Sequence, residues 1–96
     1  MHYKILLPAS LELKDAIDYY ENEFAGLGSE FLDEVEKSLT KILDYPSAWR
    51  IISENNRSCR LRRFPYSLIY AQDGNLIIIT AISHHKRKPN YWKDRL

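Results

Sequence analysis

The spacing of apolar residues changes near the middle of the 96-residue chain, from a helical period in the first half to strand-like alternation in the second. Two amphipathic helices are predicted in the first half, one on either side of Gly26-Leu27-Gly28. We expect Ser10 and Ser29 to cap their N-termini and Pro46 to stop the second helix. The apolar positions that carry this prediction are Leu13, Ala16, Ile17, Tyr20 and Phe24 in the first helix, and Phe31, Leu32, Val35, Leu39, Ile42 and Leu43 in the second.

Short apolar or alternating runs predict the strands. One precedes the helices, where Pro8 ends it, and three follow them; residues 49–52 are a candidate for one further small strand. Asp73-Gly74 predicts a hairpin with a type I′ turn between the last two strands. The final strand is apolar on both faces, which places it in the middle of a sheet. The four predicted strands span residues 3–7, 58–64, 66–72 and 76–82.

These elements predict an α+β fold in the order β-α-α-β-β-β, as a single domain over residues 1–96. Each helix has one apolar stripe, so we expect the helix hairpin to pack on one face of a mostly antiparallel, twisted sheet. Residues 90–96 are expected to form a short C-terminal turn or helix. Because Cys59 and Leu61 alternate with Arg60 and Arg62, the two arginines are expected to line the open face of the sheet.

The net charge of +1 conceals a strong asymmetry along the chain. Residues 1–49 hold ten acidic and four basic residues, a net of −6, whereas residues 50–96 hold three acidic and ten basic residues, a net of +7. The basic half either pairs with the acidic half or binds an anionic partner, such as nucleic acid or an acidic peptide. We expect a solvated helix face from the acidic stripe Glu12, Asp15, Asp18, Glu21 and Glu23.

The composition excludes several classes of protein. No apolar run approaches the roughly 20 residues that span a bilayer, and the N-terminus is too short and too soon broken by Pro8 to be a signal peptide. Cys59 is the only cysteine, so a disulfide within the chain and a cysteine zinc site are excluded, and we expect it to be a small core residue. The sequence therefore predicts a cytoplasmic protein without a cofactor.

The candidate chemistry is basic and aromatic. Adjacent strand residues point to opposite faces, so His84 and His85 do not share a metal; one of them is either a general acid or base or part of a polar strand end. Arginines hold phosphate or carboxylate groups bidentately, or they pair with the acidic helices. Tyr70 is expected in the core and Trp92 is expected to pack the tail onto the sheet. The arginines in question are Arg57, Arg60, Arg62, Arg63 and Arg87, with Tyr66 and Tyr91 among them.

Several short motifs occur in a characteristic order. Asp18-Tyr19-Tyr20, Gly26-Leu27-Gly28-x-x-Phe31 and Pro46 are followed by Phe64-Pro65-Tyr66-x-Leu68-Ile69-Tyr70, Ile82-x-His84 with basic residues, and Pro89-x-Tyr91-Trp92-x-x-Arg95. Over essentially its whole length the chain thus resembles the RelE/ParE superfamily of toxins from bacterial type II toxin–antitoxin modules. The Phe-Pro-Tyr and closing motifs are more similar to the ParE branch, often called plasmid stabilisation proteins.

The resemblance implies a growth-arresting toxin that forms a hetero-oligomer with a cognate antitoxin. An acidic antitoxin tail lying on residues 57–63 and 84–88 would fit the charge asymmetry. ParE-type toxins bind DNA gyrase and block replication, whereas RelE-type toxins cut mRNA in the ribosomal A site without metal. For a gyrase inhibitor, the residues expected to serve target binding are Arg60, Arg62, Arg63, His84, Lys86, Arg87 and Trp92.

The endonuclease alternative assigns His85 as acid or base, with Arg60 and Arg62 stabilising charge on the scissile phosphate. RelE-type enzymes of the YoeB kind carry an arginine at the position of Ser67, and their terminal His-Tyr pair corresponds here to His84-His85. A serine does not clamp phosphate as a guanidinium does, so the catalytic set is incomplete and a binding inhibitor is favoured over an enzyme. The third alternative is an inactive homologue that only binds antitoxin.

Overall fold

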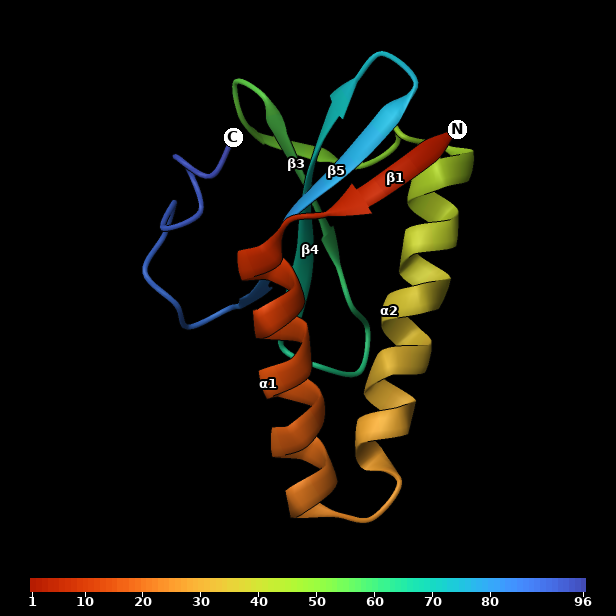
Figure 1. Ribbon diagram of the computed structural model, residues 1–96, viewed down its shortest axis with the longest axis vertical. Helices are drawn as coiled ribbons and strands as arrows, with labels where there is room; N and C mark the ends of the chain where they lie inside the picture. The colour runs from red at the N-terminus through yellow and green to blue at the C-terminus, as the bar shows by residue number, and fades with distance from the viewer.

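The computed structural model describes all of residues 1–96 and confirms the α+β fold (Figure 1). The candidate strand near residues 49–52 is present, so four strands follow the helix hairpin. Neither helix is both long and apolar enough to cross a membrane. The elements are β1 (His2–Ile5), α1 (Leu7–Glu23), α2 (Leu27–Asp44), β2 (Arg50–Ser53), β3 (Asn56–Arg60), β4 (Tyr66–Asp73) and β5 (Leu76–His84).

The five strands form one twisted sheet in the order β1-β5-β4-β3-β2 (Figure 1). β1 runs parallel to β5, and every other neighbouring pair is antiparallel. The helix hairpin supplies part of the long connection that a parallel pair requires. β5 lies inside the sheet, as its two apolar faces predicted.

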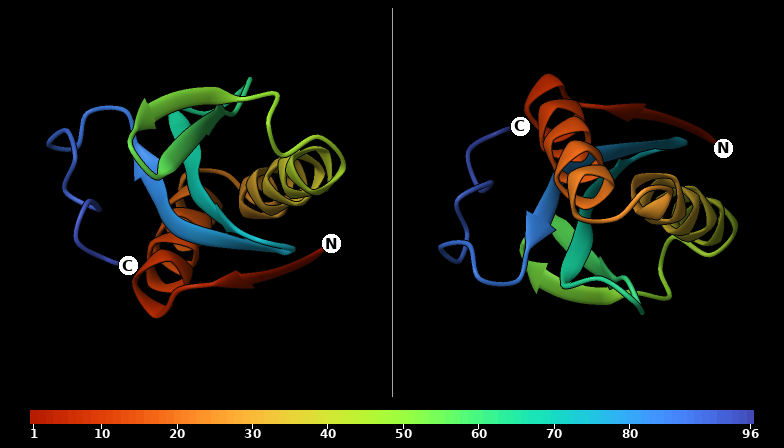
Figure 2. Two further views of the ribbon diagram at one scale, coloured as in Figure 1. Left: turned by 90° about the horizontal axis from the view of Figure 1, so that it is seen from above. Right: turned by 90° about the horizontal axis from the view of Figure 1, so that it is seen from below.

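Both helices pack on one face of the sheet, which we call the helix face; the opposite side is the outer face (Figure 2). Phe31 of α2 is fully buried at the centre of this packing, with ring centroids 5.0 Å from Phe64 and 5.1 Å from Tyr66. Tyr70 is also fully buried there, and its hydroxyl donates a hydrogen bond of 2.6 Å to the Pro46 carbonyl. The helical period therefore identified the buried stripe of α2 correctly.

A β-bulge in β5 decides which residues reach each face. Ile69 pairs with Ala81 and Tyr70 pairs with Ile79, so Thr80 is the extra residue. Because of this extra residue, the side chains of Ile79 and Ile82 both lie on the helix face although they are three residues apart. Ala81 lies on the outer face with Ile69. The Thr80 hydroxyl is buried and donates to the Ile69 carbonyl at 3.2 Å.

The two predicted helix caps are wrong. α1 begins at Leu7 and α2 at Leu27, so Ser10 and Ser29 both lie inside helices. Pro8 does not end the strand but lies in the first turn of α1, where its missing N–H would have had no helical partner in any case.

The start of α2 is stabilised by a side chain from the preceding helix. Gly26 adopts a φ of 89° just before α2, a conformation that favours glycine. The Glu21 carboxylate accepts hydrogen bonds from the N–H groups of Gly26 at 2.9 Å and Gly28 at 3.0 Å. Glu21 is thus a capping residue, where the sequence predicted only a solvated one.

The β4–β5 hairpin is confirmed, but its turn type is not. Gly74 has a φ of 58°, whereas Asn75, the second central residue, is not in the positive region. A type I′ turn needs positive φ at both central positions, and a type II′ turn places glycine at the first. The observed φ pattern is that of the type II′ turn.

Candidate target-binding surface

The predicted site residues do not form one patch. They are divided between the outer face, the α2 side of the loop that follows β3, and the loop that follows β5. The division has a local cause: β3 ends at Arg60 and β5 ends at His84, so the alternation of side chains stops at those residues.

The outer face holds Arg60 and His85. Arg60 is exposed at the end of β3 and pairs across the ladder with Ser67 of β4. The Ser67 hydroxyl is 3.0 Å from His85 Nε2, and Ser67 itself is buried. Partial burial lowers the pKa of His85, and the nearby positive charge of Arg60 lowers it further. The ring is therefore neutral at pH 7.

His84 faces the helices. Its ring packs edge-on against Tyr66 at 4.9 Å between centroids, and its Nδ1 accepts a hydrogen bond of 3.0 Å from the Lys86 N–H. The prediction that adjacent histidines point to opposite faces is therefore confirmed. No group of three histidine, cysteine, aspartate or glutamate side chains is placed to hold a metal ion.

Arg62 and Arg63 lie beyond the end of β3 and turn toward α2. Their backbone N–H groups donate to the Glu34 carboxylate. The Arg63 guanidinium also forms an ion pair of 2.9 Å with Glu30. The prediction that Arg62 lines the open sheet face together with Arg60 is wrong, because Leu61 and its successors no longer belong to the strand.

A polar pocket of about 510 Å³ lies between α2 and residues 59–63. Its three carboxylates are all engaged: Glu30 pairs with Arg63, Asp33 with Lys37, and Glu34 with the backbone of residues 62 and 63. Lys41 and Arg62 line the same pocket and have no ion pair, so the pocket favours an anion.

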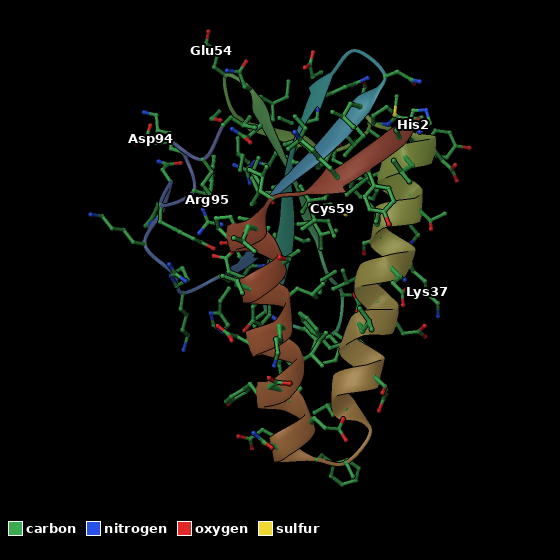
Figure 3. All side chains as sticks on the ribbon, in the orientation of Figure 1. His2, Lys37, Glu54, Cys59, Asp94 and Arg95 are labelled. Atoms are coloured by element: carbon green, nitrogen blue, oxygen red, sulfur yellow. The ribbon has the colours of Figure 1, made fainter.

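Two further residues are structural. Cys59, which Figure 3 labels, is buried in the core as predicted, and burial raises the pKa of its thiol, which argues against an activated nucleophile. Arg57 donates to the carbonyls of Ser47 at 3.2 Å and Trp49 at 2.8 Å. Its guanidinium therefore fixes the chain that enters β2.

The loop after β5 is held by a residue that the sequence placed in solvent. Glu12 of α1 is largely buried, and its carboxylate binds Tyr91 and Arg95 of the C-terminal segment, residues 85–96. Arg87 lies 3.8 Å from the same carboxylate and 3.9 Å from the centre of the Tyr91 ring. The prediction of a solvated Glu12 is wrong, because its partners are more than 60 residues away in sequence.

Trp92 packs the C-terminal segment onto the outer face, as predicted. It is buried against Ile69 and Ala81, with Tyr91 beside it. Residues 90–95 form successive turns rather than a helix. Because the indole is buried, it is not free to contact a target directly.

The sequence did not predict that Glu12 contacts Tyr91 and Arg95. Two of these three residues could have been noticed, because Tyr91 and Arg95 belong to the closing Pro-x-Tyr-Trp-x-x-Arg motif. Glu12 gave no signal of its own, because it occurs within a run of similar acidic residues.

Comparison with known proteins agrees with this architecture. The family model described as the ParE toxin of the type II toxin–antitoxin system parDE matches residues 3–89. A solved structure of the chromosomal ParDE toxin–antitoxin system from P. aeruginosa has the same fold, with a TM-score of 0.67 at 21% identity over 88% of this chain and 95% of that one. No curated protein matches. The chain thus belongs to the ParE toxin family of type II toxin–antitoxin systems.

Proposed function

We propose that this protein inhibits DNA gyrase by binding to it and that a cognate antitoxin neutralises it. Membership of the ParE toxin family over residues 3–89 carries the proposal, because gyrase is the target that the resemblance to ParE-type toxins implies. Inhibition by binding needs an exposed recognition surface and no assembled catalytic group.

The basic side chains around the ends of β3 and β5 suit such recognition. Arg60 and Arg62 are exposed and have no ion-pair partner, and the same holds for Lys86. Unpaired surface cations attract an acidic partner and set its orientation more than they add to affinity. An acidic gyrase surface would meet them together with Arg63, His84 and Arg87.

An acidic antitoxin segment would lie on overlapping residues, 57–63 and 84–88. The unpaired cations of the pocket beside α2 would then meet carboxylates of the antitoxin. Overlap of the two surfaces gives a direct route to neutralisation, because the target and the antitoxin compete for the same charges.

One observation favours the second candidate, a ribosome-dependent mRNA endonuclease. The neutral His85 ring can accept a proton, and Arg60 lies close enough to influence its pKa. Against it, Ser67 is buried and bonded to that ring, and it supplies no guanidinium for the phosphate. Target binding by the unpaired cations needs neither an acid or base at His85 nor a guanidinium at position 67, so a binding inhibitor is favoured.

The test uses purified gyrase and the full chain. We expect the wild type to block DNA supercoiling, and Arg60→Gln and Arg62→Gln to raise the half-inhibitory concentration, each by about two- to fivefold if one exposed charge contact is worth about 0.4 to 1 kcal/mol. Lys93→Gln, an exposed basic residue outside this set, should change little. His85→Ala should also change little under the proposed function. Ribosome-dependent cleavage of mRNA without inhibition of gyrase would overturn the proposal.

A further inference from the structure

Where β1 ends, side chains take over the hydrogen bonding of the β5 edge. β1 pairs with β5 only as far as Ile5 and Ile79, and Leu6 adds one more hydrogen bond to the Ile79 carbonyl. Beyond this point the β5 edge presents the Thr80 carbonyl and the Ile82 N–H. A backbone polar group left unpaired inside a fold costs about 1 to 3 kcal/mol, so both groups need partners.

Glu12 and Arg95 supply those partners together. Glu12 Oε1 accepts from the Ile82 N–H at 3.0 Å, and Arg95 Nη1 donates to the Thr80 carbonyl at 2.9 Å. The two side chains also bind each other through two hydrogen bonds, of 2.9 and 3.0 Å. Figure 3 shows Arg95 beside the first turns of α1. The bond to Glu12 raises the pKa of Arg95, so the guanidinium stays charged.

The same carboxylate reaches the rest of the C-terminal segment. Glu12 Oε2 accepts from the Tyr91 hydroxyl at 2.7 Å, and the Tyr91 ring lies under the Arg87 guanidinium. One side chain of α1 thereby joins the bulge of β5, the end of the chain and the basic loop. These contacts explain the closing Pro-x-Tyr-Trp-x-x-Arg motif. Tyr91 and Arg95 bind Glu12, and Trp92 packs on the outer face.

We propose that Glu12 is a positioning residue that holds the C-terminal segment on the sheet and thereby fixes the basic loop of residues 86–88 for contact with the target. The part that concerns the target rests on the proposed function. Glu12 itself touches no target; it acts through Tyr91, Arg87 and Arg95. Loss of its charge leaves the two helices and their core in place and frees the segment.

The experiment compares Glu12→Gln with Glu23→Gln, which changes the same residue type on an exposed position of the same helix. Amide hydrogen exchange is followed across the chain, and toxicity is measured as the inducer dose that halves growth. We expect Glu12→Gln to speed exchange in residues 85–96 by about tenfold or more, with β4 and α2 unchanged, and to raise the dose by a similar factor. Glu23→Gln should match the wild type in both.

Arg95 tests the contact from the other side, at a position near the chain end where misfolding is least expected. Arg95→Gln should reproduce Glu12→Gln, and the double variant should be no worse than either single one, because both break the same contact. Arg95→Lys keeps the charge and should restore part of both the protection from exchange and the potency.

Each result decides a separate part of the proposal. Unchanged exchange in residues 85–96 of Glu12→Gln would overturn the holding contact. Faster exchange with full potency would overturn the positioning of the loop. If the wild type arrests growth through a target other than gyrase, the proposed function fails, while the exchange and potency of these variants still decide the role of Glu12.

Discussion

The two faces of the sheet are stabilised in different ways. The helix face is covered by a cluster of 13 buried apolar residues from both helices and four strand or loop segments, so no single contact dominates. On the outer face only three buried residues, Ile69, Ala81 and Trp92, form a cluster, and the C-terminal segment that contributes Trp92 is also held at the edge of β5 by directional bonds to Glu12 of α1. Apolar packing is distributed and non-directional, whereas a polar contact depends on each of its members.

Under the proposed function, this difference separates stability from recognition. The helix face would set whether the chain folds, and the contacts of the C-terminal segment would set where the basic loop lies. Substitution of a buried residue on the helix face should therefore unfold the whole domain, whereas substitution of a buried residue on the outer face should release the C-terminal segment alone.

The largest effect is expected from Phe31→Ala on the helix face. Phe31 is fully buried and contacts three other aromatic rings, so the cavity and the lost apolar burial should together lower the free energy of unfolding by about 3 to 5 kcal/mol. Denaturant unfolding measures it. Phe24→Ala, at a phenylalanine that is 71% exposed, should stay within about 0.5 kcal/mol of the wild type.

Trp92→Ala should cost less and act locally. The loss of one buried aromatic side chain from a small cluster is worth about 1.5 to 3 kcal/mol, and it should appear as opening of residues 85–96. Hydrogen exchange should show the release there, with the Phe31 region still protected. Equal loss of protection in both regions would show that the two faces unfold as one unit.

Tyr70→Phe should cost about 1 kcal/mol on the helix face. Burial raises the pKa of Tyr70 to about 12, so its hydroxyl remains a donor to the Pro46 carbonyl, and the variant removes only that bond. The melting temperature should fall by a few degrees with unchanged exchange in residues 85–96. A variant as stable as the wild type would show that water replaces the lost donor.

The smallest effect concerns pH and His85. Because its folded pKa is lowered below the ordinary value of about 6.5, the neutral ring contributes stability that is fully present above that value. The contribution is lost as pH falls through the folded pKa. His85→Gln should flatten this part of the stability profile by less than about 1 kcal/mol, since solvent screens an exposed ring. Identical profiles for the two proteins would contradict the assignment.

The sequence predicted the helix face better than the outer face, for a physical reason. The stripe of α2 that carries Phe31 depends on a period within one element, and this period is visible locally. Arg62 was placed on the wrong side because alternation holds only while a strand continues, and β3 ends at Arg60. The role of Glu12 was missed because its partners are residues 82, 91 and 95, which no local pattern connects to α1.

The same contrast holds for the ends of the elements. Ser10 and Ser29 have the chemistry of caps, but Pro8 allows α1 to start earlier and Glu21 caps α2 from the preceding helix. Cap chemistry can be recognised in a sequence, whereas a cap supplied by another helix depends on how the chain folds back.

The central claim is that this ParE-family protein stops replication by binding gyrase. The most direct test is a pulse-label experiment in a bacterial host, with thymidine and methionine incorporation followed in the first minutes after induction from a tightly repressed promoter. The proposed function predicts early loss of thymidine incorporation while methionine incorporation continues. Early loss of methionine incorporation with replication intact would contradict it and favour the endonuclease, and continued growth with both labels would favour an inactive antitoxin-binding homologue.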